Sequence, residues 1–151
     1  MKGGLIMREA HVLGFIGLLG GAVSTFFGGW NSALTTLMIF MTIDYVSGLV
    51  LAGVFHKSKK TKSGALESSV GLKGICRKAG MLIIVIVACR LDIIAGTNYF
   101  RDATVIALIT NETISIIENL GLMSVAIPQP ILKAIDVLKQ KEETNENTSQ
   151  E

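Results

Sequence analysis

The sequence predicts an all-α fold: an integral membrane bundle of four transmembrane helices, followed by a short amphipathic helix. Half of the 151 residues are hydrophobic and the mean hydropathy is +0.54, above the balance usual for soluble domains. A helix needs about 20 apolar residues to cross a bilayer. Four stretches approach that length, at residues 12–29, 34–55, 79–96 and 103–122. We expect one membrane domain over residues 1–140 and a disordered polar tail over residues 141–151.

The third observation is that positive charge is concentrated on one side of the predicted bundle. Every Lys and Arg except Arg90 and Arg101 lies before the first stretch, in the loop 56–78, or after the fourth stretch. Since cytoplasmic loops carry an excess of Lys and Arg, both termini and the basic loop are expected in the cytoplasm. Asn111 and Glu112 interrupt the fourth stretch, so three spans and a re-entrant or interfacial segment are the alternative.

Small residues predict helix-packing faces in the first two stretches, because they allow helix backbones to approach closely in a bilayer. On the first stretch they lie at heptad-like intervals: Gly14, Gly17, Gly21 and Ser24. On the second stretch they follow the central carboxylate at helical spacing: Gly48 and Ala52. The first face is expected to meet another helix of the same bundle or of a second copy.

Asp44 lies about halfway along the second stretch. A carboxylate at this depth costs at least about 2.5 kcal/mol on insertion scales, so it must face a partner, a cavity or water. The third stretch adds Arg90 and Asp92. One interpretation pairs Asp44 with Arg90 or a neighbouring polar group to hold the bundle together. The other makes Asp44 part of a wet or protonatable path.

The fourth stretch is the most polar. On a helix one face carries Thr104, Asn111, Ser115 and Glu118, with Glu112 and Asn119 flanking it. A polar stripe on a helix of membrane length must be buried against other helices or line water. Interhelical hydrogen bonding and pore lining after oligomerisation are both consistent with this pattern.

The C-terminal part of the chain predicts the short amphipathic helix, on the inner membrane surface. Pro130 suits a helix start. Apolar residues then recur on one face: Ile131, Ala134, Ile135 and Leu138.

Catalytic and cofactor chemistry is not indicated. The sequence contains no phosphate-binding loop, dinucleotide-binding glycine pattern, zinc-protease motif or nucleophile elbow. Cys76 and Cys89 have no metal-binding spacing and predict two reduced, packed thiols. The net charge of +2 gives no reason to expect a nucleic-acid partner. We therefore expect no enzyme activity, no cofactor and no metal.

An ordered set of motifs resembles the phage lysis and toxin-secretion holin family, found in phages and prophages of Gram-positive bacteria and beside clostridial toxin genes. The resemblance extends from about Ala10 to Leu138. Its motifs are Thr42-Ile43-Asp44-Tyr45-Val46-Ser47-Gly48, Ser68-Ser69, Gly71-Leu72-Lys73-Gly74, Arg77-Lys78, Asp92, and Asn111-Glu112-Thr113-Ile114-Ser115-Ile116-Ile117-Glu118-Asn119 with Gly121 and Pro128.

The resemblance implies a holin, which accumulates in the bacterial cytoplasmic membrane and then oligomerises into lesions. The lesions release a peptidoglycan hydrolase, for host lysis, or a large toxin, without implying direct contact with either. Membrane lipids and further copies of the chain are the expected partners. We hypothesise that oligomerisation exchanges intramolecular polar contacts for a water-lined interface. Two alternatives stay open: a small channel or transporter with Asp44, Asn111 and Glu112 in its path, and an anti-holin-like scaffold.

The N-terminus offers two translation starts, Met1 and Met7. The longer product would carry one additional lysine, Lys2, and its extra charge would resist movement across an energised membrane by about 2.3 kcal/mol per 100 mV. Some holins use paired starts, with the longer form acting as the inhibitor. The other interpretation is that Met7 is an ordinary residue near the interface.

Overall fold

The computed structural model describes the backbone of residues 3–137 and the side chains of residues 11–137. It confirms the all-α prediction, and no strand occurs within that described part. The four long helices are α1 (Gly3–Phe26), α2 (Ser32–Gly53), α3 (Ser68–Ala95) and α4 (Tyr99–Leu122). A short fifth helix covers residues 129–137, where the amphipathic helix was predicted, and the predicted polar tail lies outside the described residues.

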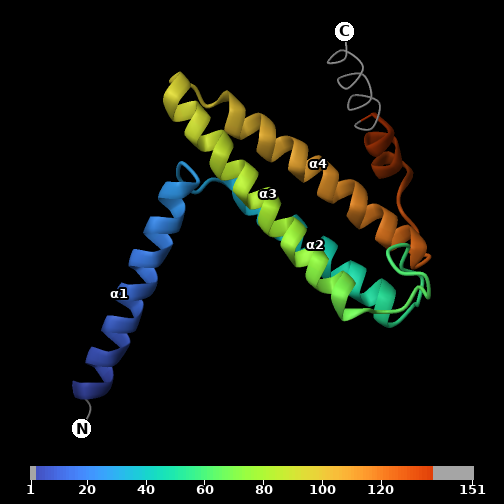
Figure 1. Ribbon diagram of the computed structural model, residues 1–151, viewed down its shortest axis with the longest axis horizontal. Coiled ribbons are helices and arrows are strands. Elements are labelled where there is room, and N and C mark those ends of the chain that lie inside the picture. The colour runs from blue at the N-terminus through green and yellow to red at the C-terminus, as the bar shows by residue number, and fades with distance from the viewer. Residues whose placement is uncertain (1–2, 138–151) are drawn as a thin grey trace.

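Helices α2, α3 and α4 lie side by side as a bundle, while α1 points away from it (Figure 1). The most extensive interface joins α2 to α4. Helix α3 packs less extensively on α4, and least on α2. One end of the bundle therefore holds the α1–α2 and α3–α4 turns, and the other holds the end of α4 and the basic loop, which in the structure is limited to residues 54–67 (Figure 1).

An apolar core fills the bundle near the two turns. It consists of Phe27, Leu34, Leu37, Met41, Val85, Cys89 and Val105. The inward positions of α2 recur at intervals of three and four residues, at Leu34, Leu37, Met41, Asp44, Gly48 and Leu51. This spacing keeps one face of a helix turned toward its neighbours. Asp44 is thus a core position that happens to carry a carboxylate.

The outer surface of the bundle is also apolar. Large hydrophobic side chains are exposed along all three helices, among them Ile39, Val46, Ile83, Val87, Leu91 and Ile106. Soluble proteins rarely expose contiguous apolar surface on this scale, whereas lipid tails would cover it at no penalty. The surface supports the predicted membrane environment.

Two of the four predicted spans are long and apolar enough to cross a membrane, namely α2 and α4. The predicted count of four is not supported on this criterion. The apolar part of α1, His11–Phe26, is shorter than a span. Helix α3 begins at Ser68, well before the predicted span, and every 18-residue stretch of it contains at least three charged residues.

The two turns at one end are fastened to each other. Gly28 and Gly29 adopt φ angles of +68° and +93°, which glycine tolerates without steric penalty. The Arg101 guanidinium of α4 donates to both of their carbonyl oxygens, at 3.3 and 2.7 Å. At the start of α2, the Asn31 side chain caps the helix by accepting from the Leu34 amide at 2.8 Å. The α1–α2 connection is thereby held against α4.

Candidate functional site: a buried charged cluster between three helices

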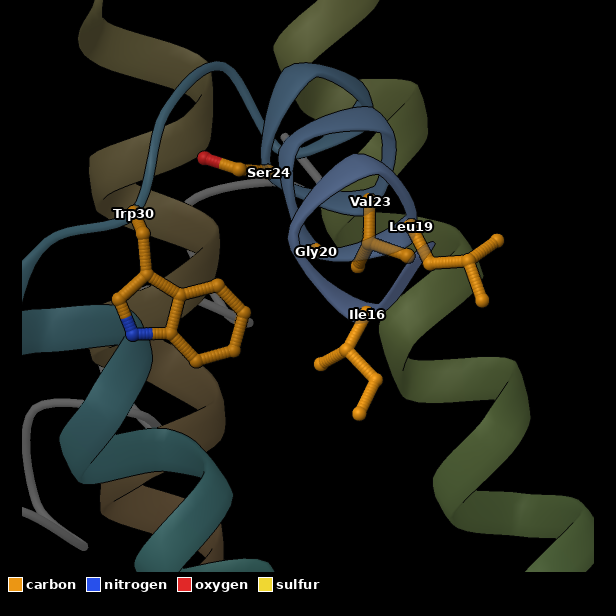
Figure 2. A pocket seen from close by; sticks show the side chains of 6 residues that line it. All are labelled: Ile16, Leu19, Gly20, Val23, Ser24 and Trp30. Carbon is orange, nitrogen blue, oxygen red and sulfur yellow. The ribbon is translucent and has the colours of Figure 1, made fainter. Parts of the chain in front are cut away.

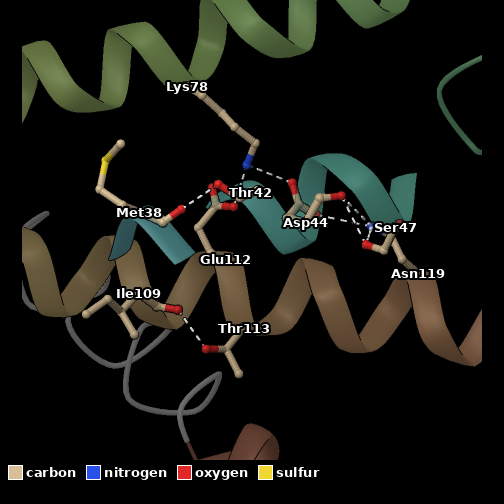
Figure 3. Close-up of polar contacts among 9 residues, drawn as sticks. All are labelled: Met38, Thr42, Asp44, Ser47, Lys78, Ile109, Glu112, Thr113 and Asn119. Atoms are coloured by element: carbon tan, nitrogen blue, oxygen red, sulfur yellow. Dashed lines mark hydrogen bonds and ion pairs between the residues drawn. The ribbon is translucent and has the colours of Figure 1, made fainter. Parts of the chain in front are cut away.

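A charged cluster lies between α2, α3 and α4 (Figure 3). The Lys78 ammonium of α3 donates to the Asp44 carboxylate of α2 at 2.8 Å and to the Glu112 carboxylate of α4 at 2.5 Å. The Glu112 side chain is only 2 % exposed, and that of Asp44 is 10 % exposed. We call Asp44, Lys78 and Glu112 the ion triad.

Asn119 extends this cluster along the α2–α4 interface (Figure 3). Its amide nitrogen donates to Asp44 Oδ1 at 3.1 Å and to Ser47 Oγ at 3.0 Å. A Cβ atom added at Gly48 would lie 3.7 Å from the same amide nitrogen. Gly48 therefore lies directly against Asn119 in the α2–α4 interface, and the space there would hold a Cβ atom at ordinary contact distance.

The ion triad lies near the middle of the helices that hold it. At 1.5 Å per residue, Asp44 and Glu112 are about 14–15 Å from the ends of α2 and α4 at the basic loop, and about 18–20 Å from the opposite ends. The hydrocarbon core of a bilayer is about 30 Å thick. If α2 and α4 cross the bilayer, the three charges are close to its midplane.

The residue spacing explains how the cluster assembles. Glu112 follows the buried Val105 by seven residues and precedes the buried Asn119 by seven. Lys78 precedes the buried Val85 by the same interval on α3. A seven-residue interval returns a side chain to nearly the same helical face. The polar residues of the cluster therefore lie on the same inward faces whose apolar residues form the core nearer the two turns.

The electrostatics of the triad favour a closed bundle. The Lys78 ammonium is the counter-ion of both carboxylates. Moving either carboxylate away from it would leave a buried charge without a counter-ion. Removing one member of a buried ion pair costs about 3–5 kcal/mol, although the intact pair is itself weak evidence for stability. The arrangement can therefore act as a specific fastening that resists small separations of the helices.

Arg90 and Asp92, the two charged residues of α3 predicted as site residues, do not join the triad. The Arg90 guanidinium lies over the Phe26 ring, 5.7 Å from its centroid. The buried Asp92 accepts hydrogen bonds from the Thr97 hydroxyl at 2.6 Å and from the Phe100 and Arg101 amides at 3.0 and 2.8 Å. Asp44 thus pairs with Lys78 and Asn119 rather than with Arg90, and Asp92 caps the start of α4.

The buried polar face of α4 is offset from the predicted one. Glu112 and Asn119, expected to flank the face, are buried, whereas Asn111 and Glu118 are exposed and Ser115 is half-buried. Thr104 of the predicted stripe donates to the Phe100 carbonyl of its own helix at 2.7 Å. Such local bonds satisfy a hydroxyl without a second helix, and Thr42 and Thr113 in Figure 3 make the same kind of bond.

The predicted packing residues of α1 lie away from the bundle. A Cβ atom added at Gly14, Gly17 or Gly21 would meet no atom within 4 Å, and Ser24 is half-buried. On α2, by contrast, Ala52 is buried. The two predicted start residues cannot be compared in this way, because Met1 and the side chain of Met7 lie outside the described part.

A shallow apolar pocket separates α1 from the start of α2 (Figure 2). Its lining is Ile16, Leu19, Gly20, Val23, Ser24 and Trp30. The Trp30 indole nitrogen donates to the Thr35 hydroxyl at 2.9 Å. No charged side chain lines this pocket, so it suits acyl chains or apolar side chains better than a polar ligand.

Lys78 is the site residue that sequence reasoning missed, since it was assigned to the cytoplasmic basic loop beside Arg77. The signal that could have identified it is a repeat of seven residues through Lys78, Val85 and Asp92, which places all three on nearly the same face of the helix. Among residues 11–137, no group of three or more His, Cys, Asp or Glu side chains is placed to hold a metal ion.

Comparison with known proteins identifies a family whose model covers the residues of this cluster. The bacteriophage holin family model matches residues 21–140, which include all four residues Asp44, Lys78, Glu112 and Asn119. No solved structure matches the chain at a significant level.

Curated relatives cover most of the chain. An uncharacterized 14.9 kDa protein in the nagH 3′ region of Clostridium perfringens is 36 % identical over 82 % of this chain and 89 % of its own length. An uncharacterized protein of C. perfringens strain 13 is 34 % identical over 93 % of this chain and 97 % of its own. A probable holin of Bacillus phage phi105 is 32 % identical over 70 % of this chain and 73 % of its own. The chain belongs to the bacteriophage holin family.

Proposed function

We propose that this protein is a holin, which forms lesions in the bacterial cytoplasmic membrane through which a peptidoglycan hydrolase or a large toxin leaves the cell. The observation that carries the proposal is the family match over residues 21–140, because this family permeabilises membranes and is not a family of enzymes. The ion triad adds a physical reason. A bundle that buries three charges near the bilayer midplane holds a polar surface that it can turn toward water.

All four long helices cross the membrane in this proposal, with the N-terminus and the basic loop in the cytoplasm. Helix α3 is more polar than a typical membrane span. Two of its charged residues, Lys78 and Asp92, have polar partners inside the bundle, which lowers the cost of placing them in the membrane. Over its full length α1 has 24 residues, or about 36 Å, which is enough to span the hydrocarbon core.

Self-association completes the proposal. No atom of the chain lies within 4 Å of a Cβ built at Gly14, Gly17 or Gly21, so these small residues are available for close packing of two α1 helices. Homo-oligomers assembled in this way would bring several bundles together, and their polar residues would line the lesion.

The test is induction of the chain in a bacterium together with a cytoplasmic peptidoglycan hydrolase that lacks an export signal. Abrupt clearing of the culture that requires both proteins is the expected result, and an inactive hydrolase serves as the control. Continued growth, with the protein verified in the membrane, would refute a lesion large enough for a folded enzyme.

A selective ion channel is the second candidate, favoured by the position of Asp44 and Glu112 near the midplane. A channel would dissipate ion gradients and stop growth, but it would leave the hydrolase inside the cell. Cell arrest without clearing therefore separates the channel from the holin. Normal growth and intact ion gradients would instead indicate an anti-holin-like scaffold.

A further inference from the structure

We propose that Lys78 is a latch that holds α3 closed against the α2–α4 pair, and that α3 is the helix that swings away when the bundle opens. This inference rests on the proposed holin function and names the moving part within it. It follows from three features of the structure: the unequal helix interfaces, the polar contacts that hold α3 at two levels, and the position of the acidic groups that α3 covers.

Helices α2 and α4 remain joined without α3. Theirs is the most extensive interface of the bundle, and the Asn119 hydrogen bonds to Asp44 and Ser47 connect them directly. Helix α3 packs less extensively on α4 and least on α2. If one helix is to separate from the other two, α3 loses the fewest contacts.

Polar side chains attach α3 to its neighbours at two levels. Asp92 holds the start of α4 through the Phe100 and Arg101 amides. Lys78 makes the other attachment, to Asp44 and Glu112. Fourteen residues separate these two levels, or about 21 Å along the helix.

The Asp92 level has the geometry of a hinge. Only residues 96–98 connect α3 to α4, and Gly96 ends α3 in the left-handed conformation, with a φ angle of +67°. At the far end of α3, residues 54–67 connect it to α2. Fully extended, 14 residues reach about 46 Å, so this loop can follow a swing of α3 that the short turn cannot.

Opening at the Lys78 level would uncover the carboxylates of Asp44 and Glu112 without a counter-ion. Lipid cannot solvate a carboxylate, so the open state requires water or counter-ions beside these groups. Separation of α3 and entry of water are therefore coupled. The bundle stays closed while Lys78 is paired with Asp44 and Glu112. When these ion pairs are broken, the α2–α4 pair exposes an acidic face.

The experiment measures the separation of α3 directly, in native membranes. A single thiol is placed at the buried face of α3 by Val85→Cys, in a chain that also carries Cys76→Ser and Cys89→Ala. Val85 is fully buried, 7 residues from Lys78 and 11 from Gly96. A charged, water-soluble thiol reagent reacts there only when water reaches the face that α3 presents to α2 and α4.

Lys78→Met is expected to raise the rate of thiol labelling by about 100-fold, because removing one member of a buried ion pair strongly favours the separated state. Lys73→Met is the matched control: it removes an exposed lysine from the same helix and should leave labelling unchanged. Lys78→Arg retains the cation and should label less than one-tenth as fast as Lys78→Met.

A neutral chain, carrying Asp44→Asn, Lys78→Met and Glu112→Gln together, separates the latch from a general folding defect. It has lost Lys78 but holds no unpaired carboxylate, so its labelling should return to within a few-fold of the starting chain. Labelling as fast as in Lys78→Met alone would overturn the proposal, as would equal labelling of the Lys78→Met and Lys73→Met chains.

Release of the co-expressed hydrolase is recorded in the same cells. If labelling responds to Lys78→Met while no chain releases the hydrolase, the latch is supported and the lesion proposal fails. If the hydrolase is released while Lys78→Met leaves the rate of thiol labelling unchanged, the protein is a holin and the latch proposal fails.

Discussion

Replacing Asn119 with Leu tests the register in which α4 packs on α2. The substitution keeps the number and branching of the side-chain heavy atoms and removes the donor to Asp44 Oδ1, at 3.1 Å, and to Ser47 Oγ, at 3.0 Å. A hydrogen bond to a charged group contributes about 1.5–3 kcal/mol and a neutral one about 0.5–1.5 kcal/mol. Polar contacts between membrane helices average nearer 0.6 kcal/mol. We therefore expect the free energy of unfolding to fall by about 2 kcal/mol.

Asn111→Leu provides the matched control on the same helix. Asn111 is exposed, and eight residues before Asn119 it lies on a different face of α4. Its replacement should change the free energy of unfolding by less than about 0.5 kcal/mol, or increase it, since a leucine is favoured over an amide in lipid.

The assay is unfolding of the purified protein in mixed micelles with increasing dodecyl sulfate. Trp30, the single tryptophan, reports the transition by its fluorescence from the α1–α2 turn. Equal destabilisation by Asn119→Leu and Asn111→Leu would refute the register. A larger effect of Asn111→Leu would favour the face predicted from the sequence, on which Asn111 and Glu118 point inward.

Three further predictions concern glycines and the N-terminus. Gly28→Ala should lower the midpoint of the same unfolding transition, because the φ angle of Gly28 is +68°, a conformation that is strained for a residue with a Cβ atom. Gly20→Ala, in a helix and with no atom within 4 Å of the added Cβ, should not lower it. Gly21→Leu should leave that midpoint unchanged but reduce cross-linked oligomers in membranes, since the Gly21 face meets nothing in the single chain; undiminished cross-linking would exclude that face as the oligomer contact. Met7→Leu should leave the time of lysis unaltered if Met7 is an ordinary residue, whereas a changed time would identify it as a second start.

The helices were predictable because each apolar stretch is long and bounded by turn-forming or charged residues. Gly28-Gly29 and Gly96 interrupt the hydrophobic pattern, and the structure ends α1 and α3 beside them. A helix over residues 65–78 leading into the third span is also what the sequence predicts, and the structure has one continuous helix from Ser68 to Ala95. The boundary of the span within that helix was harder to predict, because a start at residue 79 places Lys78 in the loop, whereas Lys78 contacts Asp44 and Glu112 inside the bundle.

The composition of the cluster was only partly predictable. Asp44 was recognisable, because a carboxylate in the middle of an apolar helix demands a partner. Its partner Lys78 was not, because a lysine beside Arg77 in a basic segment looks like an ordinary orientation signal. Only the pairing of α3 with the middle of α2 and α4 reveals that Lys78 lies deep in the bundle.

The face of α4 could not be chosen from the sequence alone. Successive residues on a helix are about 100° apart, so the stripes through Asn111 and through Glu112 are neighbours and both are polar. Which stripe is buried depends on where α2 and α3 carry complementary groups. Those groups are Asp44, Ser47 and Lys78, and they face Glu112 and Asn119.

Release of a folded enzyme from liposomes tests the central claim most directly. The purified protein is reconstituted into vesicles that contain both potassium ions and a folded cytoplasmic enzyme, and the two are measured outside the vesicles over time. A lesion-forming protein releases the enzyme along with the potassium. Release of potassium alone, with the enzyme retained, would contradict the holin function and identify a selective channel.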